Sequence, residues 1–387
     1  MNGTIYMPVG EVCSSISDTY REKKNMVTLI NTSDVLEGRV LNHERVPNSN
    51  LKGQFKKTFQ RDDILYSEIR PQNRRFAYVD FSPIDYIAST KLMVIRAKKD
   101  VVSPKYLYYF LKNSSTVAEL QLLAETRSGT FPQITFSEVA NLTIPVPSLA
   151  VQEVIVQTMQ CLEDKITCNE QINDNLQQQA FSVFDNLIAN AENNDYTVSD
   201  YAFLNPKRRL AKNQVARSID MSQLSTRGAF PSSWEIKPFN GGMRFTNGDT
   251  LLARITPCLE NGKTAFIDFL DDGEVAFGST EYIVLAPKND TPPEMLYCLA
   301  RYPAFVDYAV KNMNGSSGRQ RVSAETVGQY RLPLFDKHSL VLFKEVVSPM
   351  FLKMRYNFLE NMRLAELRDA LLPKLMSGEI DVSAVQL

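Results

Sequence analysis

The sequence predicts an α/β (α+β) protein with two similar mixed α/β domains. Two long antiparallel-packed helices are expected to separate the domains and form a coiled coil, so that a pseudo-two-fold internal repeat relates the halves. Three observations lead to this prediction. Segments of the first half recur in the second at a nearly constant offset. Short apolar runs separated by Gly, Pro, Asn and Asp are typical of strands. About forty residues with helix-period apolar spacing follow each strand-rich region.

The repeat is carried by several matched segments. "FQRDDILYSEIRP" (59–71) aligns with "FTNGDTLLARITP" (245–257) at an offset of 186. "ASTKLMVIRAKKD" (88–100) aligns with "GSTEYIVLAPKND" (278–290) at an offset of 190, and "ITFSEVANLTIPVP" aligns with "VSAETVGQYRLPLF" at 188. Because the register drifts by only a few residues over this span, we interpret the chain as two copies of one structural unit.

Each copy is expected to begin with a strand-rich part. "DILYSEI", "RFAYVDF" and "TKLMVIRA" predict strands in the first copy. A helical insert is predicted at 104–123 and again at 292–311. The resulting domain boundaries are 1–147 and 196–335 for the two mixed domains, and 148–195 and 336–387 for the two helical segments.

The long helices have matched start and stop signals. Ser148 and Asp336 are good N-caps directly after a proline-containing strand end. Gly378 and Asn190 occupy equivalent places at the other ends and tolerate a left-handed cap. Forty residues give roughly 60 Å of helix. A narrow apolar stripe on so long a helix needs a helical partner, and the obvious partner is the other copy.

Two asparagines fall on these apolar stripes at matched positions, Asn169 and Asn357. Buried asparagine in a coiled coil fixes the register of the helices. The alternative is that both residues face solvent where the helices bend. The sequence leaves these two interpretations equally open.

Several patterns that suggest chemistry have a simpler explanation. Gly262-Lys263-Thr264 resembles the end of a phosphate-binding loop, but Pro257 stands where that loop requires a glycine. Asn261-Gly262 is instead expected to be a turn between strands. Asp271-Asp272 precedes Gly273 and predicts a hairpin turn rather than a metal site. Thr291-Pro292-Pro293 predicts a helix start. We therefore predict no catalytic constellation and no metal or cofactor bound by this chain.

Composition narrows the class of protein further. The five cysteines form no Cys-x-x-Cys pair, which is typical of reduced thiols in a cytoplasmic protein. The sequence contains no run of 18 apolar residues, so no membrane span is predicted. The net charge of −1 conceals an uneven distribution, because residues 148–195 carry seven more acidic than basic side chains. Residues 1–147 and 196–335 carry basic excesses of four and two. Association with a polyanion follows such local potential rather than the total.

Two similar domains suit a partner that repeats along a line, and double-stranded DNA is such a partner. Sequence reading requires side chains that reach base edges and cations that hold phosphates. The Gly-Ser loops at 128–130 and 315–318 occupy equivalent places and permit close backbone approach to a ligand. Polar loops rich in Arg and Lys supply the candidate DNA-binding residues: Lys52, Lys56, Lys57, Arg61, Arg70, Arg74, Arg75, Arg127, Gln133, Lys207, Arg208, Arg209, Lys212, Arg244, Lys263, Arg319, Gln320 and Arg321.

At the level of motifs, the chain resembles specificity subunits of type I restriction–modification systems. "FTNGDTLLARITPCLENGKTAFIDF", "GSTEYIVLAP", "IPVPSLAVQEVIVQTMQCLEDKI" and "LRDALLPKLMSGEIDV" carry the resemblance over nearly the whole chain. It implies two target-recognition domains that each read half of a split, asymmetric DNA site. It also implies helices that act as a ruler and bind two methyltransferase subunits, with restriction subunits joining the full complex. S-adenosylmethionine would belong to the methyltransferase subunits, and ATP with Mg²⁺ to the restriction subunits.

Other functions remain compatible with the residues. The chain could belong to a methylation-only system or to a fused restriction–methylation system. A protein-interaction scaffold is the alternative from another class, and sequence-dependent DNA competition separates it from a DNA reader.

Overall fold

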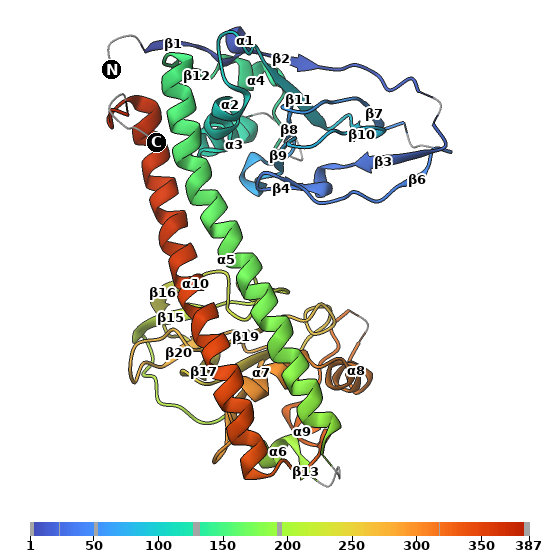
Figure 1. Ribbon diagram of the computed structural model, residues 1–387, viewed down its shortest axis with the longest axis vertical. Coiled ribbons are helices and arrows are strands. Elements are labelled where there is room, and N and C mark those ends of the chain that lie inside the picture. Colours follow the sequence, from blue (N-terminus) through green and yellow to red (C-terminus); the bar gives the residue numbers. More distant parts are fainter. Residues whose placement is uncertain are drawn as a thin grey trace. The chain divides into compact units, whose positions relative to one another are not determined.

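The computed structural model describes residues 4–22, 24–49, 53–126, 132–191, 196–316 and 318–382. The chain forms two compact units (Figure 1). Unit 1 comprises Met1–Asp164 and Leu364–Leu387, and unit 2 comprises Lys165–Arg363. Two helices of 41 residues, α5 (Leu149–Ala189) and α10 (Lys337–Ser377), each contribute one part to each unit.

The mixed domain that precedes α5 contains two four-stranded sheets. The first has the order β2-β11-β8-β9 and is antiparallel throughout. The second has the order β6-β3-β10-β7, in which β3 and β10 are parallel. Their strands are β2 (Cys13–Ile16), β3 (Met26–Ile30), β6 (Val46–Pro47), β7 (Phe55–Lys57), β8 (Ile64–Ser67), β9 (Phe76–Tyr78), β10 (Tyr86–Ser89) and β11 (Leu92–Ala97).

Smaller elements complete this domain. Strand β1 (Ile5–Pro8) pairs with β12 (Thr143–Val146), and β4 (Val35–Leu36) pairs with β5 (Arg39–Val40). The helical elements are α1 (Val9–Val12), η1 (Thr32–Asp34), η2 (Pro71–Asn73), α2 (Pro104–Lys112), α3 (Ser114–Thr126) and α4 (Phe136–Asn141).

The domain between α5 and α10 repeats this plan. Its first sheet has the order β14-β21-β18-β19, and its second has the order β16-β15-β20-β17 with β15 and β20 parallel. Strand β13 (Tyr196–Thr197) pairs with β22 (Arg331–Leu332). The remaining elements are α6 (Val198–Tyr201), β14 (Ala202–Leu204), β15 (Val215–Ile219), β16 (Glu235–Pro238), β17 (Met243–Phe245), β18 (Thr250–Ala253), β19 (Thr264–Phe266), β20 (Ala276–Gly278), β21 (Tyr282–Pro287), α7 (Pro293–Arg301), α8 (Pro303–Lys311) and α9 (Ala324–Gly328).

The two domains therefore have the same strand order and the same strand directions in both sheets. This confirms the predicted internal repeat. The structure also extends the repeat to segments whose sequences show little similarity. The succession β1-α1-β2 corresponds to β13-α6-β14. The pairing partners β12 and β22 lie in segments that the sequence had already aligned.

The strands are buried because each central strand has an apolar side chain on both faces. In β8, Ile64 and Tyr66 pack in the core that contains α2 and α3. Leu65 between them packs in a second core with Ile30 and Ala88 of the other sheet. All four residues of β8 and all four of β18 are buried. A strand enclosed on both sides appears as a continuous apolar run rather than an alternating one.

The predicted helical inserts are present, but each is broken in two. Asn113 separates α2 from α3, and its side-chain oxygen accepts a hydrogen bond from the Ser115 amide at 3.1 Å. Tyr302 separates α7 from α8, and Pro303 begins the second helix, because proline cannot donate a backbone hydrogen bond within a continuing helix.

The ends of α5 and α10 largely match the predicted signals. Asp336 accepts hydrogen bonds from the amide and hydroxyl of Ser339, at 2.9 and 2.6 Å. At the start of α5, the Ser148 hydroxyl accepts a longer hydrogen bond of 3.4 Å from the Val151 amide. Gly378 adopts the left-handed conformation with φ 78°, whereas Asn190 is not among the residues with positive φ. In the described part of the chain, no helix combines the length and apolar character that crossing a membrane requires.

Asn169 and Asn357 are both buried, which excludes the solvent-facing interpretation. Within unit 2 the Asn169 amide donates to the side-chain oxygen of Asn361 at 2.8 Å. The Asn361 amide in turn donates to the backbone oxygen of Ile166 at 3.4 Å. These bonds run between α5 and α10, so they depend on the register of the two helices.

A second relay repeats the first at positions shifted by the repeat offset. The Asn357 amide donates to Asn173 at 2.8 Å, and the Asn173 amide donates to the Met354 backbone oxygen at 3.1 Å. We call Asn169, Asn173, Asn357 and Asn361 the asparagine quartet. Its relation by the repeat favours the register interpretation. The symmetry is broken at one point, since Asn169 also donates to Glu360 at 2.7 Å.

Candidate nucleic-acid interface

Three chain segments meet in the first domain at a site that we call corner 1, comprising residues 68–70, 91 and 132–134. Backbone hydrogen bonds join them. The Ile134 amide donates to the Glu68 oxygen at 2.9 Å, and the Glu68 amide donates to the Lys91 oxygen at 3.0 Å. The Arg70 amide donates to the Pro132 oxygen at 3.1 Å. The corner therefore links the end of β8 to the turn before β11 and to the segment before α4.

The second domain has the same joint, which we call corner 2, comprising residues 254–256, 281 and 320–322. The Val322 amide donates to the Arg254 oxygen, and the Arg254 amide donates to the Glu281 oxygen, both at 3.0 Å. The Thr256 amide donates to the Gln320 oxygen at 3.0 Å. Every donor and acceptor occupies the position that the repeat assigns to its counterpart in corner 1.

Different side chains fill the two corners. In corner 1, the Lys91 ammonium lies 3.4 Å from the Glu68 carboxylate and donates to the Gln133 side-chain oxygen at 3.2 Å. In corner 2, Nε and Nη2 of Arg321 donate to the Glu281 carboxylate at 2.7 to 3.0 Å. The Arg321 guanidinium lowers the pKa of Glu281 from its usual value, so this pair is ionised at neutral pH.

Predicted DNA-binding residues gather at both corners. Corner 1 contains Gln133 and Arg70, and η2 follows directly. After η2, the Arg74 guanidinium donates to the Ser114 hydroxyl at 3.0 Å, and Arg75 donates to the Ser33 oxygen at 3.0 Å. Arg70 and Arg74 flank η2 in the left-handed conformation. Corner 2 contains the predicted residues Gln320 and Arg321, with Arg319 next to them in the chain.

A second group of predicted residues is engaged by the chain itself. The Lys57 ammonium donates to the backbone oxygens of Thr90 and Leu92 at 3.1 and 2.8 Å, and its burial lowers its pKa. Lys263 donates to the Met221 oxygen at 2.7 Å. Arg244 lies over the Phe239 ring at 5.6 Å. For these residues the structure provides a packing role.

Arg208 has the most clearly structural role of the predicted residues. Its guanidinium donates to both carboxylate oxygens of buried Asp249, at 2.5 and 2.6 Å. Burial outweighs this pairing and raises the pKa of Asp249 to about 6. The matched residue Asp63 is also buried and binds Arg96 at 2.7 and 2.8 Å. The two aspartates correspond, but their arginines come from different elements.

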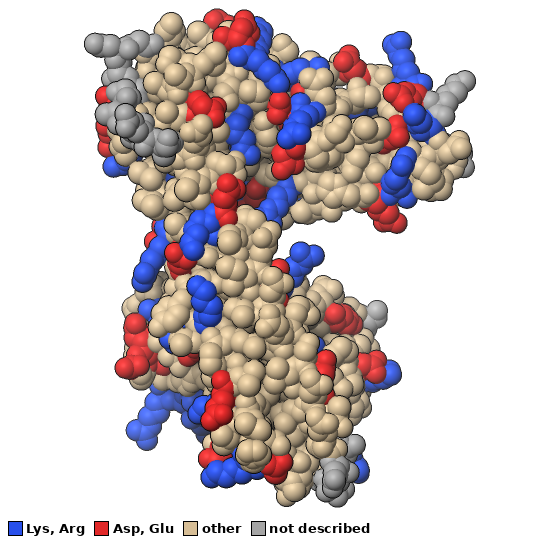
Figure 2. Space-filling model, viewed as in Figure 1, with Lys and Arg blue, Asp and Glu red and all other residues tan. Residues whose placement is uncertain are grey.

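The remaining candidates lie at the surface or outside the described residues. Lys52 and Arg127 fall outside the described residues, as does the Gly-Ser segment at 128–130. The exposed candidates suited to phosphate contact are Lys56, Arg61, Arg70, Lys207, Arg209, Lys212 and Arg319. Figure 2 shows basic and acidic side chains interspersed over the face drawn.

Sequence reasoning missed four charged residues of the corners: Glu68, Lys91, Arg254 and Glu281. The available signal was the repeat itself. Residues 68 and 254, and residues 91 and 281, are matched positions with opposite charge.

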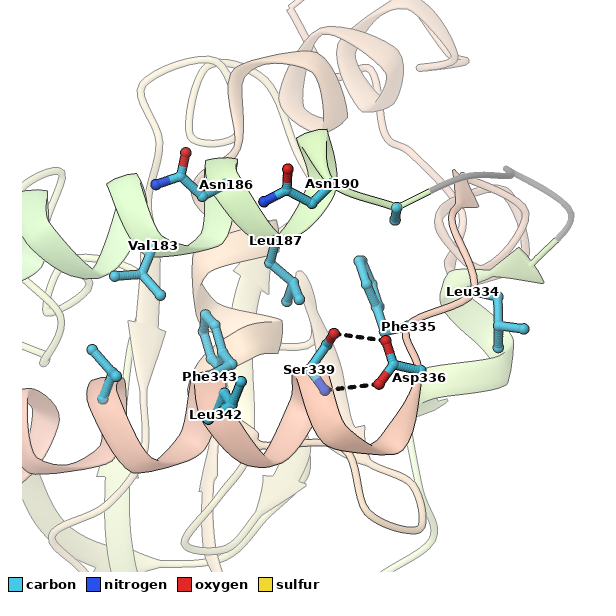
Figure 3. A pocket seen from close by; sticks show the side chains of 12 residues that line it. Val183, Asn186, Leu187, Asn190, Leu334, Phe335, Asp336, Ser339, Leu342 and Phe343 are labelled. Atoms are coloured by element: carbon cyan, nitrogen blue, oxygen red, sulfur yellow. Dashed lines mark hydrogen bonds between the residues drawn. The ribbon is translucent and has the colours of Figure 1, made fainter.

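Unit 2 also contains a groove of about 550 Å³ between the end of α5 and the start of α10 (Figure 3). Val183 and Leu187 of α5 and Phe343 of α10 line it. Among the described lining residues Asp336 is the only charged one, and its carboxylate is hydrogen-bonded to Ser339.

Across the described ranges, no three His, Cys, Asp or Glu side chains are grouped to hold a metal ion. The predicted turn at Asn261-Gly262 is confirmed, as is the helix start after Pro292. A turn is also present at Asp271–Gly273, but it is not a hairpin, because β19 and β20 on either side of it lie in different sheets.

Comparison with known proteins gives consistent matches. Residues 6–178 match the family model for the type I restriction modification DNA specificity domain. The type I restriction enzyme HindI specificity subunit of Haemophilus influenzae is 28% identical over 433 residues, covering 92% of this chain and 94% of that protein. The EcoAI specificity subunit of Escherichia coli is 34% identical over 133 residues, covering 33% of this chain and 22% of that protein. The structure of a type I restriction–modification S subunit from M. genitalium aligns over 97% of this chain and 96% of that chain, with 15% identity and a TM-score of 0.54, and therefore shares the fold.

Proposed function

We infer that this chain belongs to the type I restriction–modification DNA specificity family, and we propose that each of its two mixed domains reads one half of a split, asymmetric DNA site. As a specificity subunit it is not itself the enzyme. It selects the DNA on which partner subunits act. The sections of chain that would read DNA are residues 1–147 and 196–335.

The observation that carries this proposal is the pair of corners. Both have the same backbone hydrogen bonds, yet their charged side chains differ at every matched position. A shared backbone with exchanged polar side chains suits two readers of different sequences, because base edges are distinguished by donors, acceptors and charge. The exposed Lys and Arg around the corners would contact phosphates, which position a protein on DNA without reading its sequence.

We propose that α5 and α10 set the spacing between the two half-sites. The asparagine quartet supports this role, because cross-helix hydrogen bonds between buried amides are lost when helices slip in register. A ruler needs one register, and an entirely apolar seam would specify register less strictly.

We further propose that a methyltransferase subunit covers an exposed apolar face of α10. Val341, Leu342, Val346, Leu352 and Tyr356 are all exposed on this helix. The turns of a helix place these residues on one side. A stripe of this kind on a protein surface is typical of a contact with another protein.

The rest of the proposed assembly comes from the resemblance. Two methyltransferase subunits and, in a full complex, restriction subunits would join this chain. S-adenosylmethionine would bind to the former, and ATP with Mg²⁺ to the latter. We expect the complex to act in the cytoplasm, where the DNA is.

Competition binding tests the proposal. The chain, assembled with its methyltransferase subunits, is bound to a labelled duplex and challenged with unlabelled duplexes of varied sequence. We expect only some sequences to compete strongly, with changes in either half of the site reducing competition. Equal competition by all duplexes would contradict DNA reading and would fit a protein-interaction scaffold.

A further inference from the structure

The two corners allow a comparison within one chain, because they show which side chains the same backbone accepts. Corner 1 has Glu68, Lys91 and Gln133 where corner 2 has Arg254, Glu281 and Arg321. At the first position an acidic residue corresponds to a basic one, and at the second a basic residue corresponds to an acidic one. At the third position a neutral residue corresponds to a basic one. Each set is complementary only within its own corner.

This complementarity means that the three positions form one exchangeable unit. Lys91 contacts both Glu68 and Gln133. Glu281 contacts Arg321, and Arg254 stabilises its ionised form. Replacing only Glu281 by its counterpart, lysine, would place that lysine beside two arginines. A purely solvated surface would not need partners matched in this way.

Arg321 is not free to read a base by itself. Three guanidinium contacts go to Glu281, and Nη1 donates to the Arg319 backbone oxygen at 3.1 Å. Two further backbone bonds of 2.9 Å, between Arg321 and Asn314, close the loop that contains Arg319 and Gln320. The Gln320 oxygen accepts a bond from Thr256. The ion pair therefore anchors the base of this loop.

The anchored loop presents two side chains suited to base edges. Arg319 is exposed, and the Gln320 side chain is half-buried. Arginine binds guanine with two hydrogen bonds, and glutamine binds adenine in the same way. Such contacts discriminate between bases only when the side chains are held in position before binding.

We propose that Glu281 and Arg321 form a positioning clamp that holds Arg319 and Gln320 against the bases of the second half-site, and that the Lys91–Gln133 pair is its counterpart for the first. Glu281 is thus a specificity-determining residue that touches no base. This inference rests on the proposed DNA-reading function and assigns it to particular residues.

A charge exchange tests the clamp. Glu281→Lys breaks the pair, and Glu281→Lys with Arg321→Gln installs the Lys–Gln pair of corner 1 on the backbone of corner 2. Each variant is assembled with its methyltransferase subunits. Its binding is measured to duplexes carrying the intact site, a base change in one half-site, or a base change in the other.

The expected result is confined to one half-site. Glu281→Lys should reduce discrimination at the half-site read by residues 196–335 by about 10-fold to 100-fold, the range that one bidentate base contact supplies. Discrimination at the other half-site should not change. The double variant should regain discrimination at the same half-site, with an altered base preference, which a merely structural brace would not produce.

A matched control replaces the acidic residue by lysine and the basic residue by glutamine at another ion pair of the domain. Asp307 and Lys311 form an exposed pair of 2.6 Å on α8. Asp307→Lys with Lys311→Gln should leave discrimination at both half-sites unchanged.

Three results would overturn the clamp. One is wild-type discrimination in Glu281→Lys. Another is an equal loss of discrimination at both half-sites. The third is a double variant that behaves like the single one in discrimination and base preference. A wild-type complex without discrimination at either half-site would instead refute the proposed function itself.

Discussion

Removing one amide of the asparagine quartet should destabilise unit 2 by an amount that the hydrogen bonds predict. Asn357→Ala removes a single donor and leaves the half-buried oxygen of Asn173 without it. Removing one partner of a buried hydrogen bond costs about 1–3 kcal/mol. We therefore expect the free energy of unfolding to fall by that amount.

The matched substitution Asn169→Ala should cost more. Asn169 donates to Asn361 and also to Glu360, whereas Asn357 donates to Asn173 alone. Glu360 keeps its ion pair with Lys165 at 3.2 Å and is partly exposed, so the lost bond to it adds only a small further cost.

Tryptophan fluorescence during urea unfolding provides the assay. Trp234 is the single tryptophan of the chain. It stacks on Phe269 at 4.9 Å and lies 6.2 Å from Phe358 of α10, so it reports on unit 2. The control is Gln178→Ala, which truncates an exposed polar side chain of α5 and should change stability by less than about 0.5 kcal/mol. The register argument is refuted if both asparagine variants match this control.

Three further predictions concern charge, partner contact and DNA affinity. The raised pKa of Asp249 means that the folded state favours its protonated form. The contribution of this group to the free energy of unfolding is therefore greatest below pH 4 and is lost as pH rises through about 6. Relative to Asp249→Asn, the wild type should therefore gain up to about 3 kcal/mol between pH 7 and pH 4 in urea titrations; a difference independent of pH would contradict this. Val346→Asp with Leu352→Asp places two charges on the exposed apolar face of α10. It should reduce co-purification of a methyltransferase subunit while leaving Trp234 fluorescence unchanged, and undiminished co-purification would exclude this face. Arg209→Ala should weaken binding about equally on all DNA sequences and reduce the slope of affinity against salt by about one, as for a phosphate contact; an unchanged slope would remove Arg209 from the interface.

Features with a local signal could be predicted from the sequence. The length of α5 and α10 follows from their apolar periodicity, and the cap at Asp336 follows from its side chain. Gly378 ends α10 in the left-handed conformation, as glycine readily does. Asn190 occupies the equivalent place without that conformation, because asparagine tolerates it but does not require it.

Contacts between distant segments could not be predicted in the same way. Arg208 looked like a phosphate ligand in a basic loop, yet it pairs with Asp249, which directly precedes β18 and lies 41 residues further along the chain. The repeat gave no warning, because Asp63 receives its arginine from β11 instead. Lys57 and Lys263 likewise bind backbone oxygens that the sequence does not place beside them.

The corners show the opposite case, in which the signal was present but needed the fold to be understood. Lys91 and Glu281 are matched in the repeat and carry opposite charges. Only the backbone bonds to Glu68 and Arg254 reveal that these positions lie beside the ends of β8 and β18. Opposite charges at matched positions then mark a site of divergence rather than an ordinary surface difference.

Exchange of one domain tests the two-reader account most directly. Residues 1–147 are replaced by the corresponding domain of another specificity subunit, and the methylated adenines in DNA are mapped in cells that also contain the methyltransferase subunits. We predict that one half of the methylated sequence changes while the other half and the spacing between them stay the same. Methylation of the original sequence, or a change in both halves, would contradict the account.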